Sequence, residues 1–339
     1  MKCTIQNIAD HLGLSRNTVS KALKNSSEVS ENTRNLVIKT ASKLGYKNAT
    51  FATPVIPASE TGSNGTILFL TRTYASDSEF WTTVLRGIES ILSNANYHLA
   101  ISIMSDSDLK QLNFPQTISD SSIKGIILVE ICDKVVCDAL SQFNLPIVSV
   151  DMPNVPFEEL NGIDVVTMES KKNLKKIINQ LIEKGAESFG FVGDLYSPNV
   201  SRGFQERYNA LSECLAEHQL PLNQKNCLLH QTPEDFRNFQ TTVNNLQAMI
   251  SLPDVFICGN DWTAIQLIYA LQFLGFQIPK DICVVGFDNI PAASRISPSL
   301  TTISTPQKYL GIAAARQILE RIQHLSLIHI SEPTRQEAI

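Results

Sequence analysis

The sequence lacks any segment suited to crossing a membrane. No apolar run in the 339 residues reaches the ~18 residues that a bilayer-spanning helix needs. The first residues, MKCTIQNIAD, also lack the apolar core of a signal peptide. We therefore expect a cytoplasmic protein with no membrane partner.

The chain also lacks the residue patterns that hold metals or carry out catalysis. Its seven cysteines and six histidines are scattered, with no CxxC pair and no Cys/His spacing typical of zinc. A GxSxG elbow, a P-loop, a GxGxxG loop, an HExxH motif and an EF-hand loop are all absent. We expect buried free thiols of a reducing compartment, no catalytic residues, no metal, no cofactor and no enzymatic activity.

What the sequence does contain is an uneven division of charge. Over the whole chain, 28 basic and 33 acidic residues give a formal net charge of −5. Residues 1–50 hold eight Lys/Arg and three Asp/Glu, a charge of +5, whereas the rest of the chain carries −10. This asymmetry indicates a basic nucleic-acid-binding module joined to an acidic body.

The basic segment opens with two short helical patterns around a glycine. Thr4 can cap the first helix and Gly13 can adopt the positive φ that ends it, while Ser15 can cap the second. The residues expected to face inward are Ile5, Ile8, Ala9 and Leu12 in the first helix and Val19, Ala22 and Leu23 in the second. The residues left facing outward on the second helix are Arg16, Asn17, Thr18, Ser20, Lys21 and Lys24. The spacing favours a helix-turn-helix, although any solvated amphipathic helix pair shares part of this pattern.

A third helix is predicted to begin at a Ser30 cap and to end near Gly45. Its apolar stripe is predicted to consist of Val29, Leu36, Val37, Ala41 and Leu44. Three helices of this length would form a small bundle.

The segment Thr4–Lys47 resembles the DNA-binding head of the LacI/GalR family of bacterial transcription regulators. The resemblance rests on TIQNIADHLGLSRNTVSKALK, VSENTRNLV and LGY. It implies that Arg16 and Asn17 reach base edges in the major groove, which suits their chemistry because Arg pairs bidentately with guanine and Asn with adenine. The full set of implied DNA-binding residues is Thr4, Arg16, Asn17, Thr18, Ser20, Lys21, Lys24, Ser30 and Thr33. The hydroxyls and lysines among them would contact phosphates or bases.

The segment after this head departs from the family pattern. The proline expected after Lys47 is missing, Pro54 and Pro57 interrupt the hinge helix, and Val55 is the nearest substitute for the leucine that wedges the minor groove. Residues 48–65 are therefore predicted to form a polar linker.

From Thr66 onward, apolar runs of strand length alternate with helical patterns. Examples are TILFL, GIILVEI, FICGN and ICVVGFDN between EFWTTVLRGIESILSNA and WTAIQLIYALQFLG. This βαβα order predicts a mostly parallel α/β sheet with helices on both faces, and the length of the body favours two such subdomains. The predicted fold class is thus an all-α head followed by two α/β subdomains.

Several predicted strands end in polar residues, where ligands of open α/β sheets bind. Asp151, Asp194, Asn260 and Asp288 follow such strands. Their donors and acceptors suit a small polar ligand such as a sugar, although Asp and Asn also favour caps and turns. Asp261 is predicted to be a helix cap, whereas Asp288 is predicted to contact the ligand.

The body is similar to the effector domain of the same family, which itself resembles periplasmic sugar-binding proteins. The resemblance rests on IVSVD, FQERYNAL, FICGNDWTA, IPKDICVVGFDNIP and PSLTTIST. It implies an effector site formed by Phe80, Trp81, Asp151, Ser201, Arg207, Asn260 and Asp288. Core packing is the alternative for the two aromatic residues. The resemblance also implies discontinuous subdomains, with 66–163 plus 291–322 in the first and 164–290 in the second.

The end of the chain does not look like the strand that completes the second subdomain in the family. SLIHISEPTRQEAI resembles a translated sequencing adapter joined to a truncated reading frame. Residues 324–339 are therefore interpreted as a non-native tail, with a divergent native end as the alternative.

Together these features predict a ligand-responsive, sequence-specific DNA-binding regulator, and we expect it to be a repressor. Its expected partners are double-stranded operator DNA, a small polar effector and a second copy of the chain, since a homodimer would meet two half-sites. Two other hypotheses stay open. One is a cytoplasmic sugar-binding protein with a non-functional head, and the other is a DNA-binding head fused to an enzyme.

Overall fold

The computed structural model describes residues 4–23, 29–30, 33–34, 36–37, 40–41, 63–72, 78–195, 201–230 and 238–324. The chain divides into two compact units, residues 1–62 and 63–339. Within the described ranges, no helix is both long and apolar enough to span a bilayer.

The head unit contains helices α1 (Ile5–Leu12) and α2 (Arg16–Leu23), and its local structure follows the predicted caps. Thr4 and Asn7 form a reciprocal capping box, in which the Asn7 amide donates to Thr4 Oγ1 over 3.3 Å and the Thr4 amide donates to Asn7 Oδ1 over 2.9 Å. Gly13 ends α1 with φ of +64°. The Thr18 amide donates to Ser15 Oγ over 3.0 Å at the start of α2.

The apolar residues of both helices meet a third segment in one small core. This core consists of Ile8, Ala9, Val19, Ala22, Val29, Val37 and Ala41. The prediction that Leu36 belongs to the apolar stripe is wrong, because this side chain is exposed. Residue 44 and residues 48–62 of the predicted linker lie outside the described residues, and the linker ends before Gly65, which opens β1.

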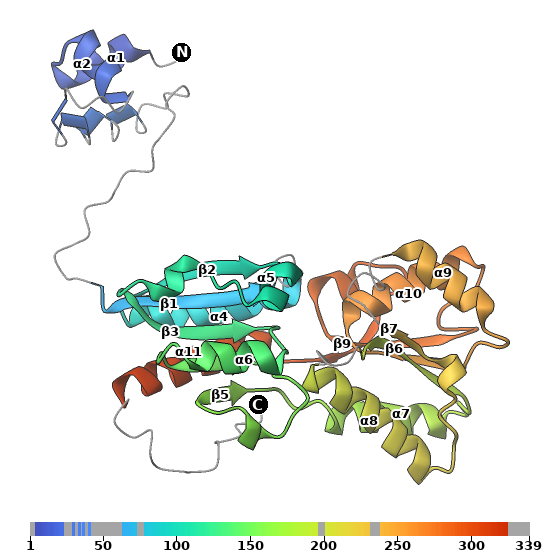
Figure 1. Ribbon diagram of the computed structural model, residues 1–339. Coiled ribbons are helices and arrows are strands. Elements are labelled where there is room, and N and C mark those ends of the chain that lie inside the picture. The colour runs from blue at the N-terminus through green and yellow to red at the C-terminus, as the bar shows by residue number, and fades with distance from the viewer. Residues whose placement is uncertain are drawn as a thin grey trace. The chain divides into compact units, whose positions relative to one another are not determined.

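The second unit contains two five-stranded parallel sheets (Figure 1). The first sheet has the order β2-β1-β3-β4-β5, with strands β1 (Gly65–Arg72), β2 (Tyr97–Met104), β3 (Ile123–Val129), β4 (Ile147–Val150) and β5 (Ile163–Val166). The second has the order β10-β9-β8-β6-β7, with strands β6 (Phe189–Asp194), β7 (Leu228–His230), β8 (Val255–Cys258), β9 (Cys283–Asp288) and β10 (Thr301–Ser304). The predicted α/β fold with two subdomains is therefore confirmed.

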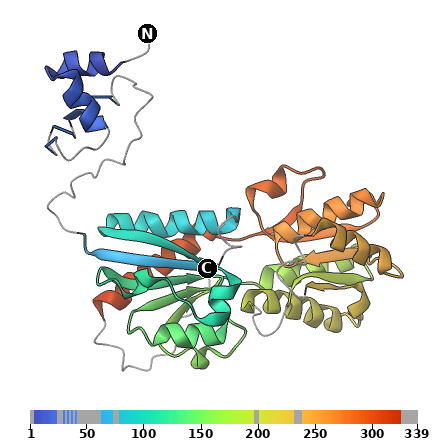
Figure 2. The same cartoon turned by 45° about the horizontal axis from the view of Figure 1, so that its top comes forward.

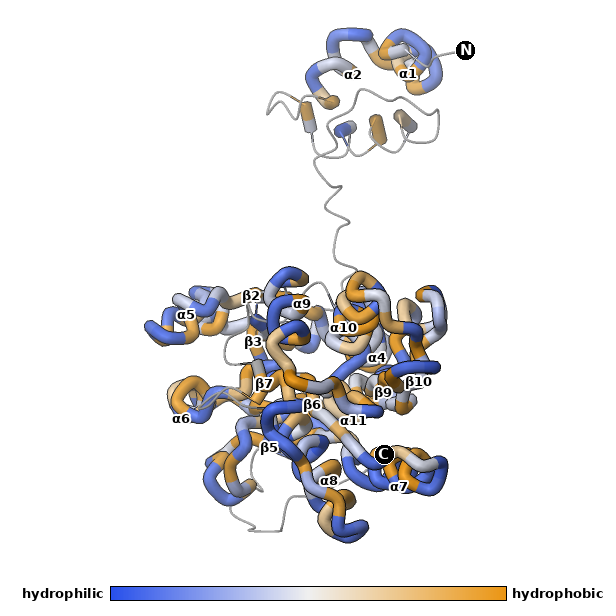
Figure 3. Tube along the Cα trace, turned by 90° about the vertical axis from the view of Figure 1, so that its right-hand side faces the viewer, coloured by the Kyte–Doolittle hydropathy of each residue, from blue (hydrophilic) through white to orange (hydrophobic). Residues whose placement is uncertain are grey.

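Helices cover both faces of each sheet, as Figure 2 shows from a second direction. The first sheet is covered by α4 (Glu79–Asn94) and α11 (Gln307–Gln323) on one face and by α5 (Asp106–Gln111) and α6 (Lys134–Ser141) on the other. The second is covered by α7 (Lys172–Glu183) and α8 (Arg202–Glu217) on one face and by α9 (Phe239–Ala248) and α10 (Asp261–Phe273) on the other. Hydrophobic and hydrophilic residues alternate along α7 and α8 in Figure 3, as expected for helices with one face on a sheet.

Short 3₁₀ turns complete the described connections. They are η1 (Gln116–Ser119), η2 (Phe157–Glu159), η3 (Gln224–Asn226) and η5 (Pro291–Ser294).

The strand pairing places both boundaries between the subdomains at other positions than predicted. β5 pairs with β4, so the first sheet continues past residue 163 to Val166. β10 pairs with β9, so Thr301–Ser304 belongs to the second sheet and not to the first subdomain as predicted. The physical reason is burial. Ile303 of β10 lies in the same buried cluster as Val285 and Phe287 of β9, and Val166 of β5 lies in the same buried cluster as Val148 and Val150 of β4. The chain thus leaves the first sheet after β5 and returns to it with α11.

Helices α4 and α11 approach each other closely at two glycines. A Cβ atom at Gly87 would lie 2.2 Å from the Lys308 carbonyl oxygen, and one at Gly311 would lie 2.0 Å from the Val84 carbonyl oxygen. This close crossing holds α4 against the first sheet and so places the start of α4, which carries two of the predicted site residues.

Candidate functional site

The head presents a polar surface on the first turns of α2. Arg16 and Asn17 are exposed, and Thr18, Ser20 and Lys21 are half-buried on the same helix. The Ser15 hydroxyl also hydrogen-bonds the Thr18 hydroxyl over 2.8 Å, which orders the turn before these residues. An exposed arginine and amide side chain at the start of the second helix is the arrangement with which helix-turn-helix proteins contact base edges.

Three of the remaining predicted DNA-binding residues, Thr4, Ser30 and Thr33, lie at helix starts. Thr4 is exposed, but its hydroxyl donates to Asn7 Oδ1 over 2.6 Å as part of the α1 cap. Ser30 and Thr33 share a 2.8 Å hydrogen bond between their hydroxyls, and the Thr33 amide donates to Ser30 Oγ over 3.4 Å. Helix starts with exposed hydroxyls suit phosphate oxygens. Lys24 lies outside the described residues.

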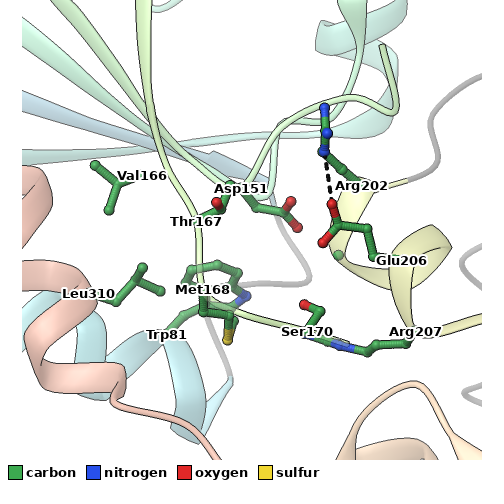
Figure 4. Close-up of a pocket in the computed structure, with 11 residues that line it drawn as sticks. Trp81, Asp151, Val166, Thr167, Met168, Ser170, Arg202, Glu206, Arg207 and Leu310 are labelled. Atoms are coloured by element: carbon green, nitrogen blue, oxygen red, sulfur yellow. Dashed lines mark hydrogen bonds and ion pairs between the residues drawn. The ribbon is translucent and has the colours of Figure 1, made fainter. Parts of the chain in front are cut away.

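The second unit contains a pocket where the carboxyl ends of β4 and β5 meet the start of α8 (Figure 4). It encloses about 340 Å³ of empty volume, including space open to solvent. Its lining residues are Trp81, Asp151, Val166, Thr167, Met168, Ser170, Arg202, Gly203, Glu206, Arg207 and Leu310. Both subdomains contribute, the second through α8, so a ligand here would contact the two subdomains at once.

Asp151 joins the two subdomains across this pocket. It follows β4 with φ of +70°, and its carboxylate accepts hydrogen bonds from the Met152 amide at 2.8 Å and from the Ser201 hydroxyl. Ser201 also caps α8, where the Phe204 amide donates to its Oγ over 3.5 Å. Burial raises the pKa of Asp151, and the Ser201 hydrogen bond opposes this shift.

Arg202, the first residue of α8, adds three further contacts to the first subdomain. Its amide donates to the Met152 carbonyl over 2.9 Å, and its Nη1 donates to the Val155 carbonyl over 3.3 Å. The guanidinium also lies over the Phe157 ring at 4.3 Å from the centroid. An ion pair with Glu206 at 3.0 Å holds the side chain in this position, as the dashed line in Figure 4 shows.

Arg207 is 5% exposed and lines the pocket from α8. Its Nη1 donates to the Gly259 carbonyl over 2.6 Å, and its guanidinium lies 3.8 Å from the centroid of the Phe287 ring. Burial lowers the pKa of Arg207, and nearby carboxylates, Asp288 first, oppose this effect. Its Nε is buried and has no hydrogen-bond partner among the described residues.

Four of the predicted effector residues do not line the pocket. Ser201 is the first of them, although its hydroxyl bonds the pocket residue Asp151. Phe80 packs in the core of the first sheet, in edge-to-face contact with Trp81 at 4.6 Å between centroids. Asn260 caps α10, accepting the Thr263 amide over 2.9 Å. Asp288 ends β9 with φ of +118° and is 8% exposed, and burial raises its pKa to about 8.

The prediction that Asp261 is a helix cap is wrong, because Asn260 takes that position. Asp261 is instead fully buried and accepts hydrogen bonds from the Ile290 amide at 2.9 Å and from the Thr302 hydroxyl. It therefore ties the start of α10 to the segments that follow β9. Burial raises its pKa to about 6, and the Thr302 hydrogen bond opposes this shift.

The sequence reasoning missed Glu130, which ends β3 with φ of +56°. Burial raises the pKa of Glu130 to about 7, and the charge of Arg72 opposes this shift. An acidic residue at the end of the apolar run GIILVEI was the available signal, equivalent to the one used for Asp151. Ser170 and Glu206 also line the pocket, and neither had a signal of this kind.

Comparison with known proteins matches both parts of the chain. The family described as bacterial regulatory proteins, lacI family, matches residues 4–48, and the periplasmic binding protein-like domain matches residues 178–335. The second match includes most of the segment interpreted as a non-native tail, so it does not set that segment apart from the domain.

Similar proteins extend this result over nearly the whole chain. Catabolite control protein A of Staphylococcus xylosus is 27% identical over 321 residues, covering 93% of this chain and 91% of the relative. A solved complex of the transcriptional regulator CelR with cellobiose has a TM-score of 0.67 at 18% identity, covering 99% of this chain and 96% of that one. The lac repressor dimer bound to operator and the anti-inducer ONPF has a TM-score of 0.63 at 20% identity, covering 95% and 93%.

The helix-turn-helix head, the two parallel sheets with a pocket between them and these matches agree. The chain thus combines a helix-turn-helix head that matches the lacI family of bacterial regulatory proteins, over residues 4–48, with a body that matches the periplasmic binding protein-like domain.

Proposed function

We propose that this chain is a transcription repressor that binds operator DNA through its head. Its affinity for the operator is proposed to change when a small polar, sugar-like effector enters the pocket. The observation that most directly supports DNA binding is the exposure of Arg16 and Asn17 on the first turn of α2. The Ser15 cap orders the start of this helix. The matches to repressors and other regulators support the same role, and they give no support to an enzymatic activity.

The effector is proposed to bind between the two subdomains. Asp151, Ser201 and Arg202 link strand ends of the first sheet to the start of α8 in the second. A ligand in this pocket prefers the subdomain arrangement that its contacts fit, and only that difference in affinity shifts the population. Arg207, Trp81 and Asp151 are the proposed contacts, and Asp288 lies close enough to influence Arg207.

A homodimer is proposed to form through the effector domains. Trp262, Tyr269 and Phe273 are exposed on α10 at spacings of seven and four residues, which places them on one side of the helix. Ile101 and Ile103 are likewise exposed on β2, an edge strand. Apolar stripes of this kind mark interaction surfaces. With DNA as its partner, the protein would act in the bacterial cytoplasm.

Base reading by the head is tested with Arg16→Ala and Asn17→Ala in the full chain. The operator is first selected from randomised duplexes, and base preference is then measured at each position. We expect each variant to lose discrimination at one or two positions, at a cost of ~1–3 kcal/mol, because a bidentate contact to a base edge is lost. Arg16 should affect a guanine and Asn17 an adenine.

Lys225→Ala is the matched control, because it removes one exposed positive charge from the body and none from the head. It should leave base preference unchanged. If both head variants kept the base preference of the wild type, Arg16 and Asn17 would not be the residues that contact the bases. A wild-type chain that binds the effector but shows no salt-dependent, selective DNA binding would instead be a sugar-binding protein with a non-functional head.

A further inference from the structure

Backbone groups of the two subdomains meet at the first turn of α8. The segment between β4 and β5 belongs to the first subdomain, because its Met152 is buried in the core of the first sheet and its Phe157 packs against that core. An isolated antiparallel bridge pairs Pro153 of this segment with Ser201. The Arg202 amide also donates to the Met152 carbonyl over 2.9 Å. The first subdomain is therefore attached directly to the start of a helix of the second.

The Arg202 side chain extends this attachment. Its Nη1 donates to the Val155 carbonyl over 3.3 Å, and its guanidinium lies over the Phe157 ring at 4.3 Å from the centroid. A ring face attracts a cation in this position. On its own helix, the Arg202 Nε donates to Glu206 over 3.0 Å, which holds the guanidinium in place. One side chain of the second subdomain thus contacts two groups of the first.

The pocket lies between these contacts and the two places where the chain crosses from one sheet to the other. Val166 ends β5 at the first crossing, and Leu310 lies near the start of α11 at the second. Figure 4 shows both on one side of the pocket and Arg202 on the other. Val166 and Leu310 belong to the buried apolar cluster that the two sheets share. The pocket is therefore bounded by an apolar joint at the crossings and by polar contacts at Arg202.

The pocket has little room between these two boundaries. Within its 340 Å³, which includes space open to solvent, the centre of a water molecule can move through only about 20 Å³. One water molecule needs roughly 10–15 Å³ by this measure, so a sugar ring enters only after the walls separate. Two buried atoms of pocket residues, the Ser170 hydroxyl and Arg207 Nε, have no hydrogen-bond partner among the described residues. A polar ligand that enters can pair with them.

Separation of the walls costs least on the Arg202 side. Hydrogen bonds that break there are replaced by bonds to water, so their net cost is small. The apolar cluster at the crossings is close-packed, and water offers no equivalent contacts in exchange. Opening is therefore expected to break the contacts of Arg202 and to leave the apolar joint intact.

We propose that Arg202 is the latch of the pocket. Its contacts with Val155 and Phe157 hold the two subdomains closed, and a ligand enters only while these contacts are broken. Arg202 thereby sets the fraction of molecules in which the pocket is open, and a ligand acts on that population. This inference rests on the effector site proposed above only for the nature of the ligand.

The first test uses acrylamide as a small molecule that reaches the pocket. The chain has two tryptophans, of which Trp81 lines the pocket and Trp262 is exposed on α10. In full-length Trp262→Phe protein, quenching by acrylamide therefore reports access to Trp81. Phe157→Leu removes the ring beneath Arg202 without changing a residue that lines the pocket, and it should increase quenching. Arg202→Ala should increase it at least as much.

The second test is hydrogen exchange in Phe157→Leu, which leaves the sequence of α8 unchanged. The Arg202 amide, whose hydrogen bond crosses between the subdomains, should exchange about tenfold faster than in the wild type, which corresponds to ~1.4 kcal/mol. Phe143→Leu is the matched control, because Phe143 packs against the same core as Phe157. Arg316→Ala removes an exposed arginine of α11. Neither control should change quenching or exchange.

Unchanged quenching in Phe157→Leu would overturn the proposal. Faster exchange at Arg202 without greater quenching would do the same, because it would show fraying of α8 and not opening of the pocket. Phe157→Leu added to Arg202→Ala should have little further effect, since both changes remove one contact, and a full additive increase would exclude Arg202 as the latch. No measurement here uses DNA, so a head that failed to bind an operator would leave this inference intact.

Discussion

Neighbouring residues of one type serve different purposes in this protein. Asn260 and Asp261 are adjacent, yet Asn260 caps α10 through a 2.9 Å hydrogen bond while Asp261 is buried and binds groups that follow β9. Both follow β8, and both residue types favour helix caps. Only the path of the chain after β9, which brings the Ile290 amide and Thr302 to this point, assigns the two roles.

Asp288 should make stability depend on pH in a direction opposite to that of most carboxylates. Burial raises its pKa to about 8, so the folded state binds the proton more tightly than the unfolded state does. Its contribution to stability is therefore complete below about pH 4 and is lost as pH rises through about 8. Asp288→Asn removes this loss. The unfolding free energy of the variant, measured with urea, should increase relative to wild type between about pH 5 and pH 9.

Asp254→Asn is the control for this measurement. Hydrogen bonds from the Glu187 and Ser188 amides lower the pKa of Asp254, so its contribution changes only at acidic pH. The unfolding free energy of that variant should change with pH in the same way as that of the wild type over this range. A parallel curve for Asp288→Asn would mean that its carboxyl group stays ionised in the folded protein.

At the scale of elements, the helices of the head are set by local interactions. Thr4, Ser15 and Gly13 lie at the ends of α1 and α2, where each satisfies backbone groups that the helix leaves unpaired. The strands of the body depend less on such signals, because a parallel strand acquires its partners from distant segments. β10 illustrates this, since its residues were predicted to belong to the first subdomain, whereas the strand pairs with β9 of the second sheet.

Gly13→Ala should destabilise the head by about 1 kcal/mol. The residue has φ of +64°, which costs an alanine roughly 1–2 kcal/mol, and a Cβ atom there would meet no other atom within 4 Å. The effect is thus one of backbone conformation alone. Hydrogen exchange of α1 and α2 amides in the full chain should be faster in the variant.

Gly13→Asn is the matched variant, because asparagine tolerates the left-handed region better than alanine does. It should retain most of the protection of the wild type. Equal exchange in the alanine variant and the wild type would show that this turn does not limit the stability of the head.

At the scale of the whole molecule, the two sheets of the body share one buried apolar cluster and are also linked by polar contacts at the pocket. Asp151, Ser201 and Arg202 connect strand ends of one sheet to a helix start of the other. Each is a polar contact, and such contacts can exchange for water or ligand at low cost, whereas the cores cannot repack. A ligand in the pocket can therefore replace these polar contacts at less cost than a change in the buried cluster would carry.

Phe273→Glu should weaken self-association of the full chain. Phe273 is 68% exposed at the end of the α10 stripe, and a charge placed in an apolar interface would lose its hydration without gaining a partner. Sedimentation velocity should show a larger monomer fraction for this variant than for wild type at equal concentration. Val135→Glu, an exposed apolar position on α6, should have no such effect. A wild-type monomer, or a fully dimeric Phe273→Glu chain, would contradict the proposed surface.

The sequence by itself determined the features that depend on neighbouring residues. The charge division, the caps of α1 and α2, the alternation of strands and helices and the polar strand ends at Asp151 and Asp288 were all readable without coordinates. Helix capping and hydrophobic periodicity act over a few residues, so they leave a mark in the sequence. The family resemblance also rests on such local motifs.

The tertiary structure decided what depends on segments far apart in the chain. It put Phe80 into a core, left the Ser170 hydroxyl and Arg207 Nε without hydrogen-bond partners among the described residues, and moved β5 and β10 across the predicted boundaries. The physical reason is that burial and electrostatic environment are properties of a packed neighbourhood. The sequence shows that a carboxylate lies at a strand end. Only its packed neighbours determine whether it is solvated, paired with another group or available to a ligand.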